Sequence, residues 1–252
     1  MPTLIEKPKQ VAYGHFLLRI ESGTEHSAPG QFINIRTSRQ NDPLLRRPFS
    51  IFNHERTVMS IVVKSVGRGS EILSQHPPGA IDAIGPLGTG FTLAANRRVL
   101  IAGGGVGNAP LFYLIKTLAG LHCDITYLYG VRAKELVYLP EQYKRHSNRF
   151  IITTDDGSEG TRGYATDVAS ELAAGGGYDM IYTCGPLPMM RAMVEAAKST
   201  PVEVSLENYF GCGIGICSGC SIETADGLKR ACVSGPVFNG SRINWDSMQD
   251  IY

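Results

Sequence analysis

The chain has 252 residues, of which 43% are hydrophobic and 19% charged, and its formal net charge is +1. These values are ordinary for a folded protein of one or two domains, and they exclude a disordered chain. A small net charge without a run of Lys or Arg gives no electrostatic basis for binding nucleic acid or an anionic membrane surface. The first residues lack a signal-peptide pattern, and no stretch approaches the ~20 apolar residues of a membrane span, so we expect a cytoplasmic protein.

Residues 1–95 are predicted to form an antiparallel β-barrel. Short apolar runs recur about every ten residues and are separated by Gly, Pro and Asn, a pattern typical of an all-β unit. The runs read HFLLRI, GQFINIR, RPFSIFN, TVMSIVVKSV and AIDAIGPLG.

Residues 96–200 are predicted to form an α/β domain with a parallel sheet, because apolar strands now alternate with helical periodicity. The first unit, RRVLIAGGGVGNAPLFYLIKTLAG, reads as a strand, a glycine turn and a helix that begins near Asn108 or Ala109. Further strands are expected at CDITYLYG, RFIITTDD and DMIYTCGP, with helices at TDVASELAA and MMRAMVEAAKS. Residues 201–252 are rich in Cys and Gly with little periodicity, which indicates a third domain held together by a metal centre.

Four of the six cysteines cluster in this last segment as Cys212-x4-Cys217-x2-Cys220-x11-Cys232. The first three spacings match plant-type ferredoxins, in which a loop wraps a [2Fe–2S] cluster and a distant fourth cysteine completes the ligand set. The alternatives are a structural zinc site, which usually has two short Cys pairs where this chain has one, or disulfides.

Two glycine-containing turns are predicted to bind a nucleotide at the carboxyl edge of the parallel sheet. Gly103, Gly104, Gly105 and Gly107 connect a strand to a helix, whose N-terminus can receive a pyrophosphate. Cys184, Gly185 and Pro186 follow another strand and should face the same crevice. Each turn alone could equally serve chain packing or chain reversal.

A further candidate site lies in the barrel, at Arg47-Pro48-Phe49-Ser50 and the later Gly69-Ser70. An arginine can clamp a diphosphate, and a serine hydroxyl can reach the polar edge of a flavin. The alternative is a solvated surface arginine.

Taken in order, the motifs RPFS, GRGS, GPLGTGF, LIAGGGVG and TCGP resemble the ferredoxin reductase family of flavoproteins. The segments TTDDGSEGTRGYATD, SLENYFGCGIGICSGC and CVSGPVFNG narrow the resemblance to electron-transfer subunits of NAD-linked dihydroorotate dehydrogenase. The resemblance spans nearly the whole chain and implies an FAD-binding barrel, an NAD-binding α/β domain and a [2Fe–2S] segment.

The resemblance also implies roles for individual residues. Lys64 stands where Arg is more often expected, and Arg132 leaves NADP conceivable beside NAD. Cys184 is expected near the site of hydride transfer, as the one catalytic residue. The residues implied at FAD are Arg47, Pro48, Phe49, Ser50, Val62, Val63, Lys64, Gly69 and Ser70; those at NAD are Gly103, Gly104, Gly105, Gly107, Gly185 and Pro186; the cluster ligands are Cys212, Cys217, Cys220 and Cys232.

In the implied pathway, a separate FMN-containing subunit oxidises dihydroorotate to orotate for pyrimidine biosynthesis, and the two subunits form a heterotetramer. Electrons then pass through the cluster and FAD to NAD, because the cluster carries single electrons and nicotinamide accepts a pair. The alternatives are a paralogous subunit of an NADH-dependent ferredoxin:NADP oxidoreductase or of a sulfide dehydrogenase, and a zinc-stabilised binding module without enzymatic activity.

Overall fold

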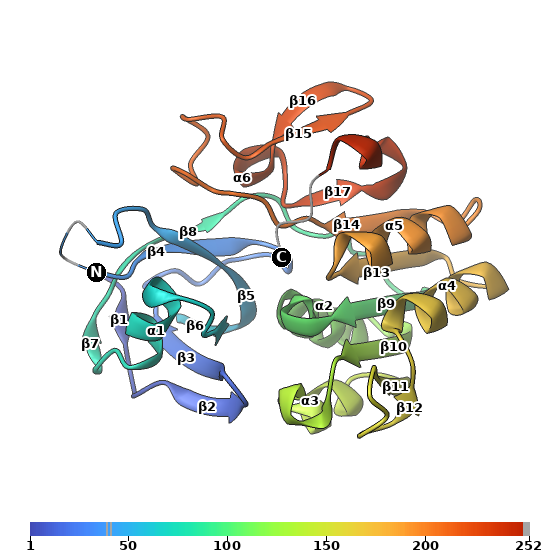
Figure 1. The fold of residues 1–252 in the computed structure, drawn as a ribbon, viewed down its shortest axis with the longest axis horizontal. Helices are drawn as coiled ribbons and strands as arrows, with labels where there is room; N and C mark the ends of the chain where they lie inside the picture. Colours follow the sequence, from blue (N-terminus) through green and yellow to red (C-terminus); the bar gives the residue numbers. More distant parts are fainter. Residues whose placement is uncertain (39, 41, 249–252) are drawn as a thin grey trace.

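The computed structural model describes residues 1–38, 40 and 42–248. Figure 1 shows an N-terminal barrel beside an α/β unit, with the C-terminal segment lying across the top of both. The prediction of a β-barrel followed by an α/β sheet is confirmed. The division at residues 95 and 200 stays a prediction, and the last four residues of the predicted third domain lie outside the described residues.

The barrel is an antiparallel sheet in which the described strands follow the order β7-β1-β3-β6-β5-β4-β8, with β2 paired to β3. Alternation along the strands sends every second side chain inward, where Leu18, Ile51, Ile61 and Val63 form its fully buried core. The strands are β1 (Thr3–Leu4), β2 (Lys9–Ala12), β3 (His15–Glu21), β4 (Phe32–Arg36), β5 (Arg47–Glu55), β6 (Val58–Lys64), β7 (Gly79–Ala80) and β8 (Asp82–Leu87).

A short helix, α1 (Arg68–Ser74), follows β6 at residues for which the sequence analysis predicted no helix. The Ser70 hydroxyl accepts hydrogen bonds from the backbone N–H groups of Val66 (2.9 Å) and Gly67 (3.1 Å). These bonds satisfy free donors at the start of the helix, which explains why so short a helix forms here.

The second sheet has the order β12-β11-β10-β9-β13-β14-β17 among the described strands. The chain starts at β9, runs outward to β12, then returns to the other side of β9 at β13, so the strand order reverses between β9 and β13. Ligands bind in such sheets at this reversal, beyond the carboxyl ends of the strands. The strands are β9 (Arg98–Gly104), β10 (Asp124–Val131), β11 (Arg149–Thr154), β12 (Thr161–Arg162), β13 (Met180–Cys184), β14 (Val202–Ser205) and β17 (Val237–Asn239).

Helices cover both faces of this sheet, as the alternating pattern predicted. On one face α2 (Asn108–Gly120) and α3 (Pro140–Arg145) bury Leu111 and Tyr143. On the other, α4 (Ala165–Gly175) and α5 (Leu187–Ala196) bury Ala169 and Met190. Single 3-10 turns occur at η1 (Gly105–Gly107), η2 (Lys134–Leu136), η3 (Gly240–Arg242) and η4 (Trp245–Ser247).

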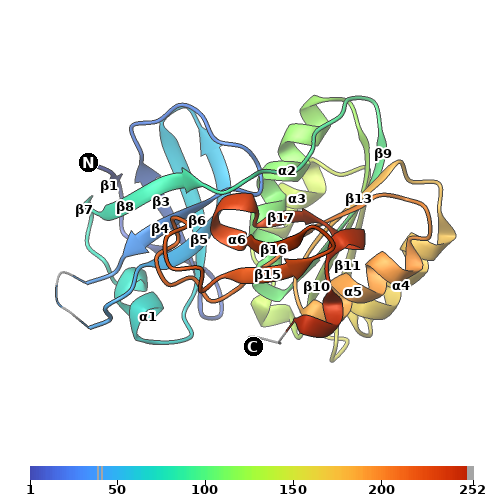
Figure 2. The ribbon, with the colours of Figure 1, turned by 90° about the horizontal axis from the view of Figure 1, so that it is seen from above.

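The cysteine-rich segment starts and ends on the α/β sheet. β14 leads into it and β17 closes it, and these two strands pair antiparallel with Val204 opposite Phe238. Between them lie the hairpin β15 (Ser221–Thr224) and β16 (Gly227–Arg230) and the single turn α6 (Ala231–Ser234). Viewed from above, this segment crosses the boundary between the barrel and the α/β unit (Figure 2).

The barrel and the α/β unit meet in a hydrophobic interface in which β5 packs against α2. The rings of Phe52 and Phe112 stack with centroids 4.5 Å apart and an interplanar angle of 14°. At the edge of this interface the Tyr113 hydroxyl donates to the Ser27 carbonyl (3.0 Å), and Lys116 forms an ion pair with Glu55. The two units are therefore held in one fixed orientation.

No helix in residues 1–38, 40 and 42–248 is both long enough and apolar enough to cross a lipid bilayer.

Phe112→Ala should lower the free energy of unfolding by about 3–5 kcal/mol, because it opens a cavity in the interface and removes the aromatic stack. Urea unfolding followed by circular dichroism measures this loss. Leu228→Ala is the control, since Leu228 is 74% exposed and its removal should change stability by no more than about 0.5 kcal/mol. Equal stability of the Phe112 variant and the wild type would contradict this account of the interface.

Candidate functional site

A cavity of about 270 Å³ lies where the barrel, α2 and the start of the cysteine-rich segment meet. β5 and β6 form one wall, the start of α2 a second, and residues 205–210 a third. Its volume is near the lower end of the range for small-molecule sites. The described residues around it are Phe32, Pro48, Phe49, Ser50, Val62, Lys64, Val66, Val106, Ala109, Pro110, Ser205, Leu206, Glu207, Asn208, Phe210 and Pro236.

Five of the residues predicted at FAD line this cavity, namely Pro48, Phe49, Ser50, Val62 and Lys64. Val63 does not, because alternation along β6 turns its side chain into the barrel core, where it is fully buried. Only the backbone of Val63 is left to face a ligand. An apolar wall with a hydroxyl and one ammonium group suits a flat aromatic ring with a polar edge.

Arg47 and Gly69 lie beside each other at the start of α1. A side chain at Gly69 would come within 3.3 Å of the Arg47 Nε and 3.4 Å of the Thr37 hydroxyl. That hydroxyl is buried and has no hydrogen-bond partner among the described residues. An unsatisfied buried hydroxyl beside a guanidinium fits the oxygen atoms of a phosphate. Ser70 is occupied differently, since its hydroxyl caps α1 and donates to the Gly67 carbonyl (2.8 Å).

The buried side chain of Asn108 holds the predicted glycine loop, residues 103–107, in place through hydrogen bonds. Its Nδ2 donates to the carbonyls of Gly105 (2.8 Å) and Gly130 (3.2 Å), and its Oδ1 accepts from the Tyr127 hydroxyl (2.5 Å). A side chain at Gly103 would lie only 2.2 Å from the Asn108 Oδ1, so this glycine is required by packing. The loop is rigid, and its Val106 reaches the cavity wall.

The second predicted turn lies directly against the first, because β13 pairs with β9 in parallel and places Cys184 opposite Gly103. Pro186 approaches so closely that a side chain at Gly104 would lie 2.6 Å from its Cδ. Cys184 itself is 1% exposed, and burial raises the pKa of its thiol well above the usual range. The thiol therefore stays protonated and packs behind the loop, without lining the described cavity.

The four clustered cysteines are free thiols, without disulfide bonds between them. The Cys212 thiol contacts that of Cys217, and the Cys232 thiol contacts that of Cys220. Among the described residues, no three His, Cys, Asp or Glu side chains converge as they would around one metal ion. Four cysteine side chains, three from the loop and one from α6, are the ligand set that a [2Fe–2S] cluster commonly takes.

Backbone amides of the cysteine loop point at the sulfur of Cys212. The N–H groups of Ile214 (3.5 Å), Ile216 (3.3 Å) and Cys217 (3.4 Å) all donate to it. These bonds, with that of Ile214 contributing most, lower the pKa of Cys212 to about 6. Burial instead raises the pKa of Cys232 to about 11. The exposed side of the loop is therefore preorganised to hold a negatively charged sulfur, as a cluster ligand requires.

Arg132 lies exposed just beyond the end of β10, and its carbonyl accepts a hydrogen bond from the Asp156 N–H (3.3 Å). The site also contains a residue that the sequence analysis did not select, Glu207. It lies in the cavity wall, five residues before the first clustered cysteine. Burial raises its pKa to about 7, against a smaller opposing effect of the Lys64 ammonium. An acidic residue between the apolar run VEVSL and the cysteine motif was the available signal.

Glu207→Gln should change how stability depends on pH. The folded protein holds a proton on Glu207 up to about pH 7, whereas the ordinary value for this carboxyl is 4.5, so the wild type loses stability as pH rises between these values. The glutamine variant stays neutral, and its advantage over the wild type should grow to at most about 3 kcal/mol by pH 8.5. Melting temperatures at pH 5, 7 and 8.5 measure this.

Glu141→Gln is the matched control for this experiment, because Glu141 is exposed at the start of α3 and should leave the pH profile unchanged. Parallel pH profiles for the wild type and Glu207→Gln would contradict the assignment of a protonated Glu207.

Two protein-family models match the chain, one over the cysteine-rich segment and one over the α/β unit. An iron-sulfur cluster binding domain of dihydroorotate dehydrogenase B matches residues 207–244, which include all four clustered cysteines. An oxidoreductase NAD-binding domain matches residues 100–195, which include both glycine turns.

Whole proteins resemble the chain over most of its length. The electron transfer subunit of dihydroorotate dehydrogenase B (NAD(+)) from Desulforamulus reducens is 38% identical over 230 residues, covering 87% of this chain and 88% of that protein. The same subunit from Geobacillus sp. is 39% identical with the same coverage.

A solved structure of an NADH-dependent reduced ferredoxin-NADP oxidoreductase superposes with a TM-score of 0.87 at 31% identity, covering 97% of this chain and 90% of that one. A ferredoxin NADP+ reductase from Neisseria gonorrhoeae, at 14% identity and a TM-score of 0.65, shares the fold. From these matches together, the chain belongs to the family of electron transfer subunits of NAD(+)-linked dihydroorotate dehydrogenase B.

Proposed function

We propose that this chain transfers electrons from an FMN-containing dihydroorotate dehydrogenase subunit, through a [2Fe–2S] cluster and FAD, to NAD. In the overall reaction, dihydroorotate and NAD+ give orotate, NADH and a proton. The chain itself would carry out no proton abstraction from dihydroorotate, which belongs to the partner subunit.

The strongest support for this proposal is that residues from three separate parts of the chain line the same cavity. Ser50 comes from the barrel motif, Val106 from the nucleotide loop, and Phe210 from the segment that runs into the cysteine loop. A flavin in this cavity would lie next to both the iron–sulfur site and the nicotinamide site. Short separations of this kind are what sequential electron and hydride transfer require.

The residues of the cavity would each have a physical role. FAD supplies the exchange between single electrons and a hydride. Pro48, Phe49 and Val62 would exclude water from the ring, and Ser50 and Lys64 would bind its polar edge. Arg47, together with the Thr37 hydroxyl, would bind the phosphates. Cys184 would support the nicotinamide turn by packing, since its buried thiol is protonated.

The partner would cover the cysteine loop. Four large apolar side chains around that loop are exposed: Tyr209 (68%), Ile214 (45%), Ile216 (78%) and Val233 (45%). Exposed apolar groups in one region are typical of an interaction surface. We therefore propose this surface for the FMN-containing subunit, in a heterotetramer, so that electrons would enter directly at the cluster.

A cytoplasmic location is part of the proposal. All six cysteines fall within the described residues and are free, as expected for a chain in a reducing compartment.

A second candidate function is that of a subunit of an NADH-dependent ferredoxin:NADP oxidoreductase, favoured by the superposition at a TM-score of 0.87. One experiment distinguishes the two proposed functions. Purified chain is analysed for FAD, iron and sulfide, then combined with the FMN subunit and assayed for NAD-dependent orotate formation. Orotate formation supports the first function. A colourless, zinc-containing protein would refute both, and NADH-dependent reduction of NADP without orotate formation would favour the second.

Cys217→Ser should remove the iron–sulfur absorption bands and reduce orotate-linked NAD reduction to background, because the cluster loses a ligand. Flavin absorption and NADH-dependent dye reduction should remain, since neither passes through the cluster. Cys123→Ser is the control. Cys123 is buried just after the end of α2, outside the cysteine loop, and its thiol donates a hydrogen bond to the Ala94 carbonyl (3.1 Å). This variant should keep the iron–sulfur absorption bands. Intact cluster absorption in the Cys217 variant would contradict the ligand assignment.

A further inference from the structure

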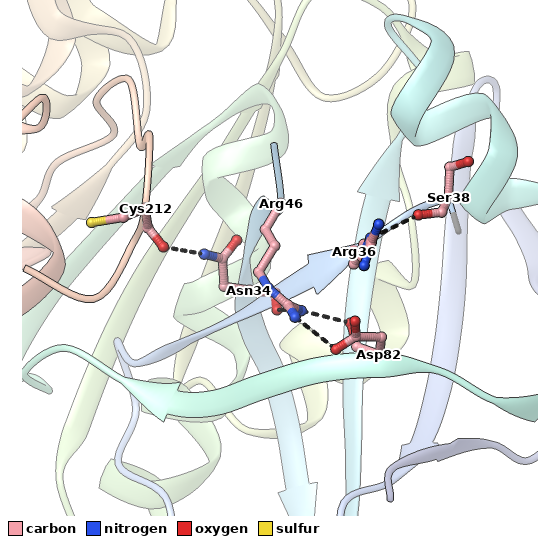
Figure 3. A network of polar contacts seen from close by, with 6 residues as sticks. All are labelled: Asn34, Arg36, Ser38, Arg46, Asp82 and Cys212. Atoms are coloured by element: carbon pink, nitrogen blue, oxygen red, sulfur yellow. Dashed lines mark hydrogen bonds and ion pairs between the residues drawn. The ribbon is translucent and has the colours of Figure 1, made fainter. Parts of the chain in front are cut away.

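A side chain of the barrel reaches directly into the cysteine loop. Asn34 on β4 is fully buried, and its Nδ2 donates a hydrogen bond to the Cys212 carbonyl (3.1 Å). Figure 3 shows this contact between strands and loop that are far apart in the sequence. This hydrogen bond joins the cysteine loop to the barrel.

The fit around this amide is tight. A side chain at Gly213 would lie 2.2 Å from the Asn34 Nδ2, and Gly213 has φ +71°, a conformation that favours glycine. The peptide between Cys212 and Gly213 can therefore approach Asn34 only because residue 213 lacks a side chain. The Asn34 Oδ1 is buried and accepts no hydrogen bond from residues 1–38, 40 or 42–248, which costs free energy of folding.

The backbone of Asn34 is fixed on its other side. It pairs with Pro48, one of the residues lining the cavity. Arg46 donates to the Asn34 carbonyl (3.4 Å) and the Asp82 carbonyl (3.0 Å), and its guanidinium forms an ion pair with the Asp82 carboxylate (2.7 Å), as Figure 3 shows. The donor on Asn34 is thus held in place by β5 and β8.

We propose that Asn34 is a positioning residue that fixes the cysteine loop against the flavin-binding barrel and tunes the cluster held there. Its amide places the positive end of a dipole beside the peptide of Cys212. Hydrogen bonds around the ligands help to set the reduction potential of an iron–sulfur cluster, and a nearby donor favours the more negative, reduced form. Losing this donor would therefore lower the potential.

The test compares Asn34→Leu with the wild type, both as purified with their cofactors. The cluster's midpoint potential is measured by redox titration, and its environment by the electron paramagnetic resonance spectrum of the reduced protein. We expect a lower potential and a changed spectrum with an unchanged amount of FAD per chain. Asn53→Leu is the control, because the Asn53 amide bonds to Glu55 and Lys116 at the domain interface and should leave both cluster measurements unchanged.

A double-mutant cycle tests the contact itself. Gly213→Ala should lower the potential and the melting temperature, since the added methyl group collides with Asn34. In an Asn34→Ala background that collision is absent, so the same glycine change should cost less, and the two effects should not add. If the leucine variant does not fold, Asn34→Ala, which removes the donor without adding bulk, decides the same question.

An unchanged potential and spectrum in Asn34→Leu or Asn34→Ala, or additive effects in the cycle, would overturn the inference. The inference rests on the proposed function, and the two fail differently. A wild-type protein without iron and sulfide would refute the cluster, whereas a loaded wild type and a loaded variant with identical cluster properties would refute only the role of Asn34.

Discussion

The packing of α2 on β5 is the constraint on which the rest of the site depends. The same helix stacks Phe112 on Phe52 and, one turn earlier, presents Ala109 and Pro110 to the cavity. Any shift of the helix along the barrel would therefore change the interface and the cavity together. Since α2 also follows directly from the glycine loop, this packing sets where a nucleotide bound at that loop meets the flavin wall.

The cysteine-rich segment is held by the structure at both ends and along its loop. Its ends are the antiparallel strands β14 and β17, and its loop is bound by Asn34 from the barrel and by Arg230, which donates to the Gly215 carbonyl. Leu206, Ile222 and Ile243 of this segment also lie in the buried cluster under α4 and α5, so the segment is anchored by packing as well as by hydrogen bonds.

The fold and much of the site could be predicted from local sequence. Short apolar runs separated by turn residues predicted the main barrel strands, and the spacing of Cys212, Cys217 and Cys220 predicted a two-iron cluster. The short helices α1 and α3 and the edge strand β17 were not predicted, because each depends on tertiary contacts and too few residues carry a periodic signal. The inward orientation of Val63 follows from the register of β6, which no local pattern specifies.

Glu207 and Asn34 show why polar residues of a site are the harder part to predict. Each is an isolated polar residue whose significance comes from what is brought next to it: the cavity wall for Glu207, and the peptide of Cys212 for Asn34. A residue 178 positions away supplies the partner of Asn34, so its role exists only once the barrel and the cysteine loop have come together. Neither contact can be predicted from the local sequence, because both depend on residues that only the tertiary fold brings together.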